Sequence, residues 1–421
     1  MTDPAAAAAP VGSRERIVVL DVLRGFALLG MILVHFHSYA NTFHDLPGHD
    51  RTAFESAISW VVWLFVETKS YATFAFLFGV GFAVQLRRRG DRGAPFVFFY
   101  VRRLLVLGLI GLCAHALFGF AVLFGYAYRG LWLLPMRRWA TRSLLAAALV
   151  SATFLSLYDI GLRARDWATL GREQAIAASD ARQQAAVGRF RAVRANLNAA
   201  EEQSSYPVTV RARLRDMAWH YTQPFFLLPS AILTLFLLGM VAVRHGIFEE
   251  PRRWTRVTVG VMIFGIVGWA VARWGLPLWN GTSTAAWILE SARDGLGLFN
   301  EQWLALTYVG ALLLLIGYRP IWLARLEPFA WAGRMALTNY LLQIVVLDLL
   351  FAGYALNFDI RESMVIPATL ALFGIEIAIS RYWLGRFRFG PMEWLWRTLS
   401  YGHREPLALA AQPVPVERAG A

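Results

Sequence analysis

Long apolar stretches recur along this chain, separated by short loops in which arginine is alternately abundant and scarce. The hydrocarbon core of a bilayer is about 30 Å thick, so a helix that crosses it needs about 20 mostly apolar residues. Stretches of that size follow one another from Ile17 to the neighbourhood of Arg388. The sequence therefore predicts an all-α integral membrane protein that crosses the bilayer many times.

The composition supports this prediction. Of the 421 residues, 57% are hydrophobic and only 16% are charged, whereas a soluble domain carries about 25% charged residues. The formal net charge is +13, but the arginines lie in short loops beside apolar spans rather than in a basic surface of the kind that binds nucleic acid. We interpret the charge as a topology signal with some attraction to membrane lipids, and we expect no nucleic-acid partner.

The apolar stretches divide into about ten expected transmembrane helices. Their ranges are 17–39, 57–86, 98–117, 119–136, 140–160, 222–243, 255–274, 300–318, 328–351 and 364–385. The loops after the second, fourth, sixth, eighth and tenth of these are rich in arginine, as at Arg87 to Arg89. By the positive-inside rule, both termini are expected to be cytoplasmic.

The remaining segments complete the predicted organisation. Residues 14–160 form an N-terminal membrane bundle of five spans, 161–221 an external helical loop, and 222–405 a C-terminal membrane bundle. The tails 1–13 and 406–421 are expected to be disordered. Within the external loop, residues 172–202 are rich in helix formers of mixed charge, so they predict a solvated helix. A second piece, 277–300, is expected to lie along the outer interface.

Ionisable groups inside the spans are the first candidates for function, because each costs about 2.5–3.5 kcal/mol in the hydrocarbon. Lys69 is the single lysine of the chain and falls well inside the second span, near Glu67. We expect its side chain to face the bundle interior, within reach of Glu67 or Glu376. The alternative is a buried ion pair that only fixes helix packing.

Other polar groups sort by depth. Near the cytoplasmic face lie Asp21, Arg24, Arg102, Arg103 and Arg334; deeper lie Asn339 and Gln343; and near the outer face lie His35, His37, His115, Asp159 and Asp348. Asp21 and Arg24 are three residues apart and can pair on one helix face, and Arg334 and Glu376 lie at comparable depth. His35 and His115 stand at the same outer level, which favours shared chemistry over two separate structural histidines. No metal-binding spacing is present.

Three long motifs add a resemblance. They are LDVLRGFALLG at residues 20–30, GRMALTNYLLQ at 333–343 and GPMEWLWR at 390–397. Together with residues 68–81 and the segment from Arg102 to His115, they resemble the bacterial family called domain of unknown function 418, the YeiB-like proteins.

The YeiB-like proteins are in turn similar to the transmembrane acyltransferases, a superfamily that includes heparan-alpha-glucosaminide N-acetyltransferase. The shared cue is Asp-x-x-Arg-Gly at residues 21–25. The resemblance implies a multi-pass protein of the bacterial inner membrane, an acyl donor such as acyl-CoA on the cytoplasmic side, and a small-molecule or glycan acceptor outside.

One departure from the family bears on activity. Family members usually carry a Gly-Asp-Ile-Leu segment shortly after the histidine that matches His115, and here residues 116–126 contain no acid. If that aspartate orients the histidine, another group must replace it in this protein. His35 also stands where asparagine is common in the family.

Our leading interpretation is a transmembrane acyltransferase. In it Arg24, Arg102 and Arg103 meet the anionic end of the donor, since guanidinium groups bind phosphate in a bidentate manner. Donor or substrate contacts along a polar passage are predicted for four residues, Lys69, Arg334, Asn339 and Gln343. The predicted general base is His35 or His115. Structural or relay charges are predicted for Asp21, Glu67, Asp348 and Glu376. The alternatives are a transporter or lipid flippase that uses the same charges as a substrate or proton path, and a non-catalytic scaffold.

Overall fold

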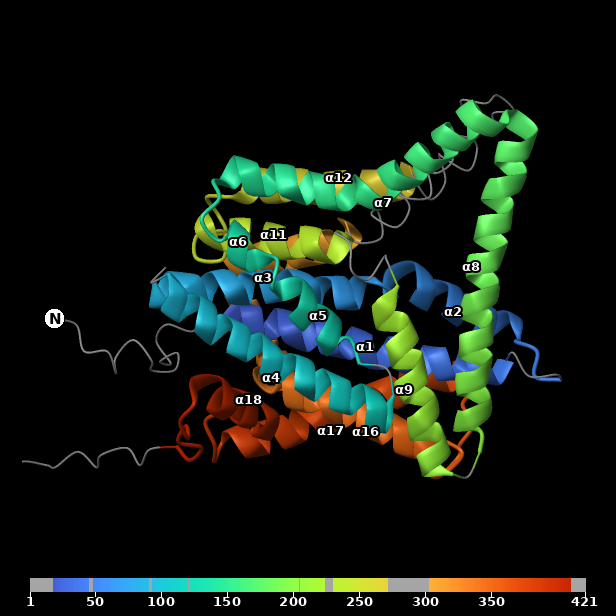
Figure 1. Cartoon of the computed structure of the whole chain (residues 1–421). Helices are drawn as coiled ribbons and strands as arrows, with labels where there is room; N and C mark the ends of the chain where they lie inside the picture. Colours follow the sequence, from blue (N-terminus) through green and yellow to red (C-terminus); the bar gives the residue numbers. More distant parts are fainter. Residues whose placement is uncertain are drawn as a thin grey trace, which may run out of the picture.

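A computed structural model describes residues 18–44, 48–90, 93–119, 121–203, 205–223, 230–271 and 303–409 of the protein, and these residues are almost entirely helical (Figure 1). In these ranges the sole β contact is an isolated bridge between Phe387 and Ala408. The all-α prediction is confirmed. The N-terminal tail, the end of the C-terminal tail and the predicted interfacial piece 277–300 lie outside the described residues.

Five helical segments are long and apolar enough to cross a membrane. They are α1 (Val18–His44), the consecutive α2 (Ala53–Phe65) and α3 (Lys69–Arg89), α4 (Ala94–Phe118), α7 (Thr141–Leu170) and α17 (Glu362–Leu384). Two further helices, α15 (Glu327–Arg334) and α16 (Ala336–Phe351), are apolar enough to cross only when taken together, and they meet at a bend of 80°, as in a broken span or a re-entrant loop. The protein therefore has the helices of a multi-pass membrane protein.

Shorter helices occupy other predicted spans. Three apolar helices, α11 (Ala231–Arg244), α12 (Thr255–Ala270) and Trp303–Tyr318, coincide with three of them. The predicted span 119–136 contains two short helices, α5 (Leu123–Gly130) and α6 (Leu133–Met136), instead of one. Gly119, with a φ of +103°, ends α4 just before them, in a backbone conformation that glycine adopts without a steric penalty.

The long helices lie side by side, and two further helices stand against one end of the bundle (Figure 1). These are α8 (Arg172–Glu201), which coincides with the helix predicted at 172–202, and α9 (Tyr206–Thr222). The short α14 (Ile321–Arg325) precedes α15, and the amphipathic α18 (Pro391–Tyr401) lies at the opposite end of the bundle from α8.

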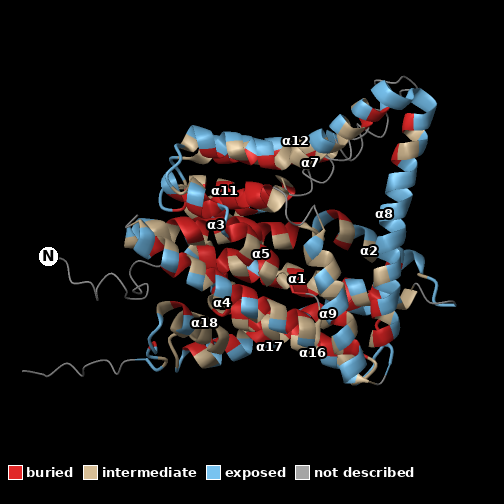
Figure 2. Cartoon of the chain, viewed as in Figure 1, coloured by how far each residue is buried: buried red, intermediate tan, exposed pale blue. Residues whose placement is uncertain are grey.

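Burial follows this arrangement. Figure 2 shows α8 exposed along most of its length, while α1, α3 and α11 are largely buried. Large apolar side chains are exposed on α7 and α12, as at Leu149 and Phe264. A continuous apolar surface of this kind suits contact with lipid.

Glycine residues set the closest helix crossings. A Cβ added at Gly25 of α1 would overlap the backbone of Phe329, and one at Gly333 of α15 would overlap the backbone of Asp21. Small residues at such contacts let membrane helices approach closely. The crossing brings the start of α1 against the end of α15, where the two helices carry Arg24 and Arg334.

Candidate functional site

A partly open space of about 270 Å³, which we call the inner cavity, lies between α1, α3, α4, α5, α15, α16 and α18. Its polar lining consists of four arginines, two carboxylates and an amide, namely Arg24, Arg103, Arg334, Arg397, Asp21, Glu393 and Gln85. The rest of its wall is mainly apolar or aromatic and includes Met31, Phe74, Leu77, Phe78, Leu107, Leu123, Tyr126 and Tyr340.

The arginines are held by specific contacts. Arg24 Nη1 donates to Asp21 Oδ1 at 2.7 Å, which confirms the predicted pair. The guanidinium of Arg103 lies 3.6 Å from the centre of the Trp396 ring, and Trp396 Nε1 donates to the carbonyl oxygen of Arg103 at 2.9 Å. α18 therefore fixes one of the cavity arginines by a cation–π contact.

The bend between α15 and α16 forms another part of the cavity wall. Glu393 of α18 accepts hydrogen bonds from the backbone N–H groups of Leu337 and Thr338, at 2.6 and 3.1 Å, and from the Thr338 hydroxyl at 2.5 Å. These donors belong to the first turn of α16, whose N–H groups have no partners within the helix. Burial raises the pKa of the Glu393 carboxyl, and the bonds from Thr338 oppose this effect. The second and third family motifs thus meet at one helix N-terminus.

The inner cavity has the chemistry of an amphiphile site. Four arginines against two carboxylates leave an excess of two positive charges in its lining, and guanidinium groups bind phosphate and carboxylate strongly. The apolar wall favours a hydrocarbon or acyl portion of the same ligand. Among the described residues, no group of three or more His, Cys, Asp or Glu side chains is arranged to hold a metal ion.

His35 lies just beyond the apolar end of the cavity. It follows Met31 by one turn of α1, and its ring centre is 6.4 Å from that of Tyr340. The Tyr340 hydroxyl accepts a hydrogen bond from the backbone N–H of Val122 at 3.0 Å. His35 Nδ1 is buried and has no hydrogen-bond partner in the described part of the chain.

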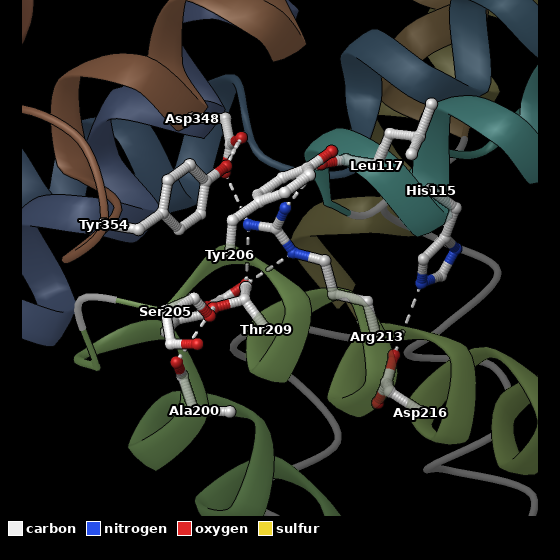
Figure 3. Close-up of polar contacts among 11 residues, drawn as sticks. His115, Leu117, Ala200, Ser205, Tyr206, Thr209, Arg213, Asp216, Asp348 and Tyr354 are labelled. Carbon is white, nitrogen blue, oxygen red and sulfur yellow. Dashed lines mark hydrogen bonds and ion pairs between the residues drawn. The ribbon is translucent and has the colours of Figure 1, made fainter.

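His115 lies on the other side of the segment that joins α4 to α5, and it is buried. Its Nε2 is 3.5 Å from Asp216 Oδ2, and its Nδ1 is 3.2 Å from the Tyr221 hydroxyl, both on α9 (Figure 3 shows the contact with Asp216). The Tyr221 hydroxyl in turn donates to the carbonyl oxygen of Ala121 at 3.3 Å. A carboxylate therefore faces His115 even though the segment after it contains no acid.

Sequence reasoning missed Asp216, because it lies 101 residues from His115 in the external loop. One signal was present: it is the single carboxylate of α9. A lone acid in a helix rich in arginine, close to a histidine-bearing span, was a candidate partner for a buried imidazole.

Arg213, one turn before Asp216, anchors α9 to the bundle (Figure 3). Its Nη2 donates to Asp348 Oδ1 at 2.5 Å, its Nη1 to the carbonyl of Leu117 at 2.9 Å, and its Nε to Glu201 Oε1 at 3.1 Å. Tyr354 also donates to Asp348. Burial lowers the pKa of Arg213, but the bond and charge of Asp348 outweigh it and leave the pKa above its usual value.

The other predicted site residues lie elsewhere. Lys69 is 1% exposed and donates to the carbonyl of Trp63 at 3.3 Å, and Glu67 lies in the break between α2 and α3. Asn339 donates to Ala332 and Ser380, and Gln343 donates to Glu376 Oε2 at 3.1 Å. The structure brings Arg24, Arg103 and Arg334 together on the inner cavity, whereas Lys69, Arg102, Asn339 and Gln343 are not among the residues that line it.

The sequence relationships agree with this arrangement. Residues 242–403 match the family described as protein of unknown function (DUF418). The C-terminal part of the chain therefore resembles the DUF418 family. This family match covers both the bent α15–α16 pair and α18, so the cap that Glu393 provides lies within it.

Relatives match nearly the whole length of this chain. YxaH of Bacillus subtilis is 29% identical over 95% of this chain and 98% of its own length. YeiB of Escherichia coli is 28% identical over 92% of this chain and 96% of its own, and both are described as uncharacterised. Residues 16–171 also match the catalytic region of heparan-alpha-glucosaminide N-acetyltransferase. No solved structure is significantly similar. The N-terminal part of the chain, residues 16–171, therefore resembles a transmembrane acyltransferase.

Proposed function

We propose that this protein transfers an acyl group from a cytoplasmic acyl-CoA-like donor to an acceptor at the outer face of the membrane. The observation that carries the proposal is the inner cavity, which combines four arginines with an apolar wall that ends at Tyr340 beside His35. The resemblance of residues 16–171 to an N-acetyltransferase catalytic region supports the reaction class.

The length of the cavity wall suits an extended donor. Arg24 and His35 are 11 residues apart on α1, and at about 1.5 Å per residue they are about 16 Å apart along the helix. A phosphate-bearing head bound at the arginines would place a thioester arm along the apolar wall. The reactive carbonyl would then lie near the histidine level of the bundle.

The acceptor needs a base at that level. A neutral imidazole can accept a proton from an attacking hydroxyl or amine. His115 has the better electrostatic support, because Asp216 at 3.5 Å would stabilise the imidazolium that forms. His35 lies closer to the cavity, and the acceptor would be a small molecule or a glycan.

The proposed reaction also requires a defined membrane topology. We infer about ten passes through a bacterial inner membrane, with both termini cytoplasmic and lipids around α7 and α12. The arginine-rich ends of α3 and α11 lie at the same end of the bundle as α18, and α8 and α9 lie at the other (Figure 1). A cysteine placed at Phe190 of α8 should therefore react with an impermeant reagent added outside intact cells; reaction only from the cytoplasm would reverse the topology.

The donor site is tested by binding. Purified protein in nanodiscs is titrated with acetyl-CoA, palmitoyl-CoA and CoA, and Arg24→Gln and Arg334→Gln are compared with wild type. Loss of one charge-assisted hydrogen bond, about 1.5–3 kcal/mol, should weaken binding by about 10- to 100-fold. Arg386→Gln is the matched control, because Arg386 packs on Tyr382 away from the cavity. Equal affinities in all variants would refute the site.

A second candidate function has an observation of its own. The 80° break between α15 and α16 resembles the discontinuous helices that form substrate sites in transporters. Transport or lipid flipping would move an anionic substrate without changing it. Mass spectrometry of the product decides: a covalently acylated acceptor supports transfer, and an unchanged, relocated substrate supports transport.

A further inference from the structure

One face of α17 carries buried polar side chains along most of the helix. They are Glu362, Thr369, Glu376 and Ser380, each at most 2% exposed. Their spacings of seven, seven and four residues place them on the same side of a helix. None of them lines the inner cavity, so they form a polar line separate from the proposed donor site.

A histidine–carboxylate pair occupies the outer end of this line. His37 Nδ1 lies 2.7 Å from Glu362 Oε1, and both side chains are buried. Asn41 Nδ2, which can only donate, lies 3.1 Å from His37 Nε2. Nε2 is therefore the acceptor, so Nδ1 carries the hydrogen that is donated to Glu362. Asn41 is half-buried and contacts Arg51 in turn, so the pair connects to the surface through these two side chains.

Deeper in the bundle, Glu376 faces Gln343. Gln343 Nε2 donates to Glu376 Oε2 at 3.1 Å, and both side chains are fully buried. Among the described residues, Glu376 Oε1 and Gln343 Oε1 have no hydrogen-bond partner, and neither do Glu362 Oε2 and Thr369 Oγ1. The two oxygens of the Glu376–Gln343 pair are acceptors that lack a donor.

A single proton resolves this shortage. An ionised Glu376 would leave a buried charge with only one amide donor, which is a costly arrangement. A protonated Glu376 is neutral, and its O–H group can donate a hydrogen bond to a nearby acceptor, as a carboxylic acid does beside an amide. The titratable and charged groups that contact α17 or its start are His37 and His44 on α1, and Glu55 on α2 with its partner Arg361. Arg381, on α17 itself, lies over Trp331 of α15.

We propose that Glu376 binds an exchangeable proton, which reaches it from the outer face through the His37–Glu362 pair. Glu362 and Glu376 are 14 residues apart, or about 21 Å along α17, and the Thr369 hydroxyl lies midway between them. A hydronium ion outside gives up its proton to the pair, and the carboxylate of Glu376 becomes a neutral acid. No other bond changes.

The site also has a consequence that rests on the proposed acyl transfer. In that reaction the O–H or N–H group of the acceptor loses its proton outside as the new acyl bond forms. The thioester C–S bond breaks, and the sulfur takes up a proton inside. One proton is thus released outside and one consumed inside for each acyl group. A proton carried inward by Glu376 would make the overall transfer electroneutral.

Infrared difference spectroscopy tests the proton site without any substrate. Purified protein in nanodiscs should show a carboxylic-acid C=O band that titrates with pH and disappears in Glu376→Gln. Asp348→Asn is the matched control, because Asp348 is equally buried but pairs with Arg213, so the band should persist. Identical spectra for wild type and Glu376→Gln would overturn the proposal, whatever the result for acyl transfer.

The outer route is tested by exchange. When reconstituted protein is moved into D2O, the same band shifts as its proton is replaced. Glu362→Gln and His37→Gln should slow this shift at least tenfold, while Asp159→Asn on α7 should not. An unchanged rate in both variants would refute loading through the pair. Variants that fail to elute as a single species on size exclusion are replaced by Glu362→Asp, for which an intermediate rate is expected and a wild-type rate counts against the route.

Discussion

Replacing Arg213 by leucine should destabilise the protein by about 3–5 kcal/mol, because it leaves Asp348 charged and buried without its cationic partner. The two side chains are 2% and 0% exposed, and their contact distance is 2.5 Å. The Tyr354 hydroxyl would still donate to Asp348, so we expect a value near the lower end of this range. The carbonyl of Leu117 also loses one of its two donors and keeps the Tyr206 hydroxyl at 3.1 Å.

Equilibrium unfolding of purified protein in detergent, followed by tryptophan fluorescence, measures this change. Arg213→Leu, Asp348→Leu and the double variant form a cycle in which the double variant should be more stable than Arg213→Leu, since it lacks the unpaired Asp348 carboxylate. Asp348→Leu should cost less than Arg213→Leu, because Arg213 keeps Glu201 as a partner. Arg253→Leu is the control, because it disrupts an exposed pair with Glu250 and should have little measurable effect. Additive effects within about 0.5 kcal/mol would refute the reasoning.

Three further predictions concern other contacts. Glu393→Leu removes the cap of α16 and should lower thermal stability by about 1–2 kcal/mol, whereas a wild-type melting curve would argue against the cap. His115→Ala should lower acyl-transfer turnover by about 10²–10⁴-fold with unchanged abundance; loss of abundance instead would indicate a structural histidine. Burial lowers the pKa of His220 and the charge of Asp216 opposes this, so the unfolded chain binds the proton more tightly than the folded protein does. Stability should therefore fall as the pH drops through about 6.5, and His220→Gln should flatten this dependence in melting curves at several pH values.

Local features of the structure followed from the sequence. The apolar stretches predicted the long helices, and the three-residue spacing of Asp21 and Arg24 predicted their pair. The mixed-charge composition of residues 172–202 predicted α8. Each of these depends on residues within a few turns of one helix, where spacing determines which side chains meet.

Contacts between distant helices could not be predicted in this way. Trp396 meets Arg103 across 293 residues, and Asp216 meets His115 across 101. Depth in the membrane suggested which groups lie at one level, but several helix faces meet at each level. Asn339, for example, donates to Ser380 of α17 rather than lining the inner cavity.

The cap on α16 has a consequence for biogenesis. The half-span α16 leaves the ribosome more than 40 residues before Glu393, so its first turn must enter the membrane region before its capping carboxylate has been synthesised. The inner cavity is complete only after α18 has folded back against α4 and α16. The site therefore assembles late in synthesis, and a chain interrupted before α18 would lack the wall that α18 gives the inner cavity. In such a chain the backbone N–H groups of Leu337 and Thr338 would lack the Glu393 carboxylate as their acceptor.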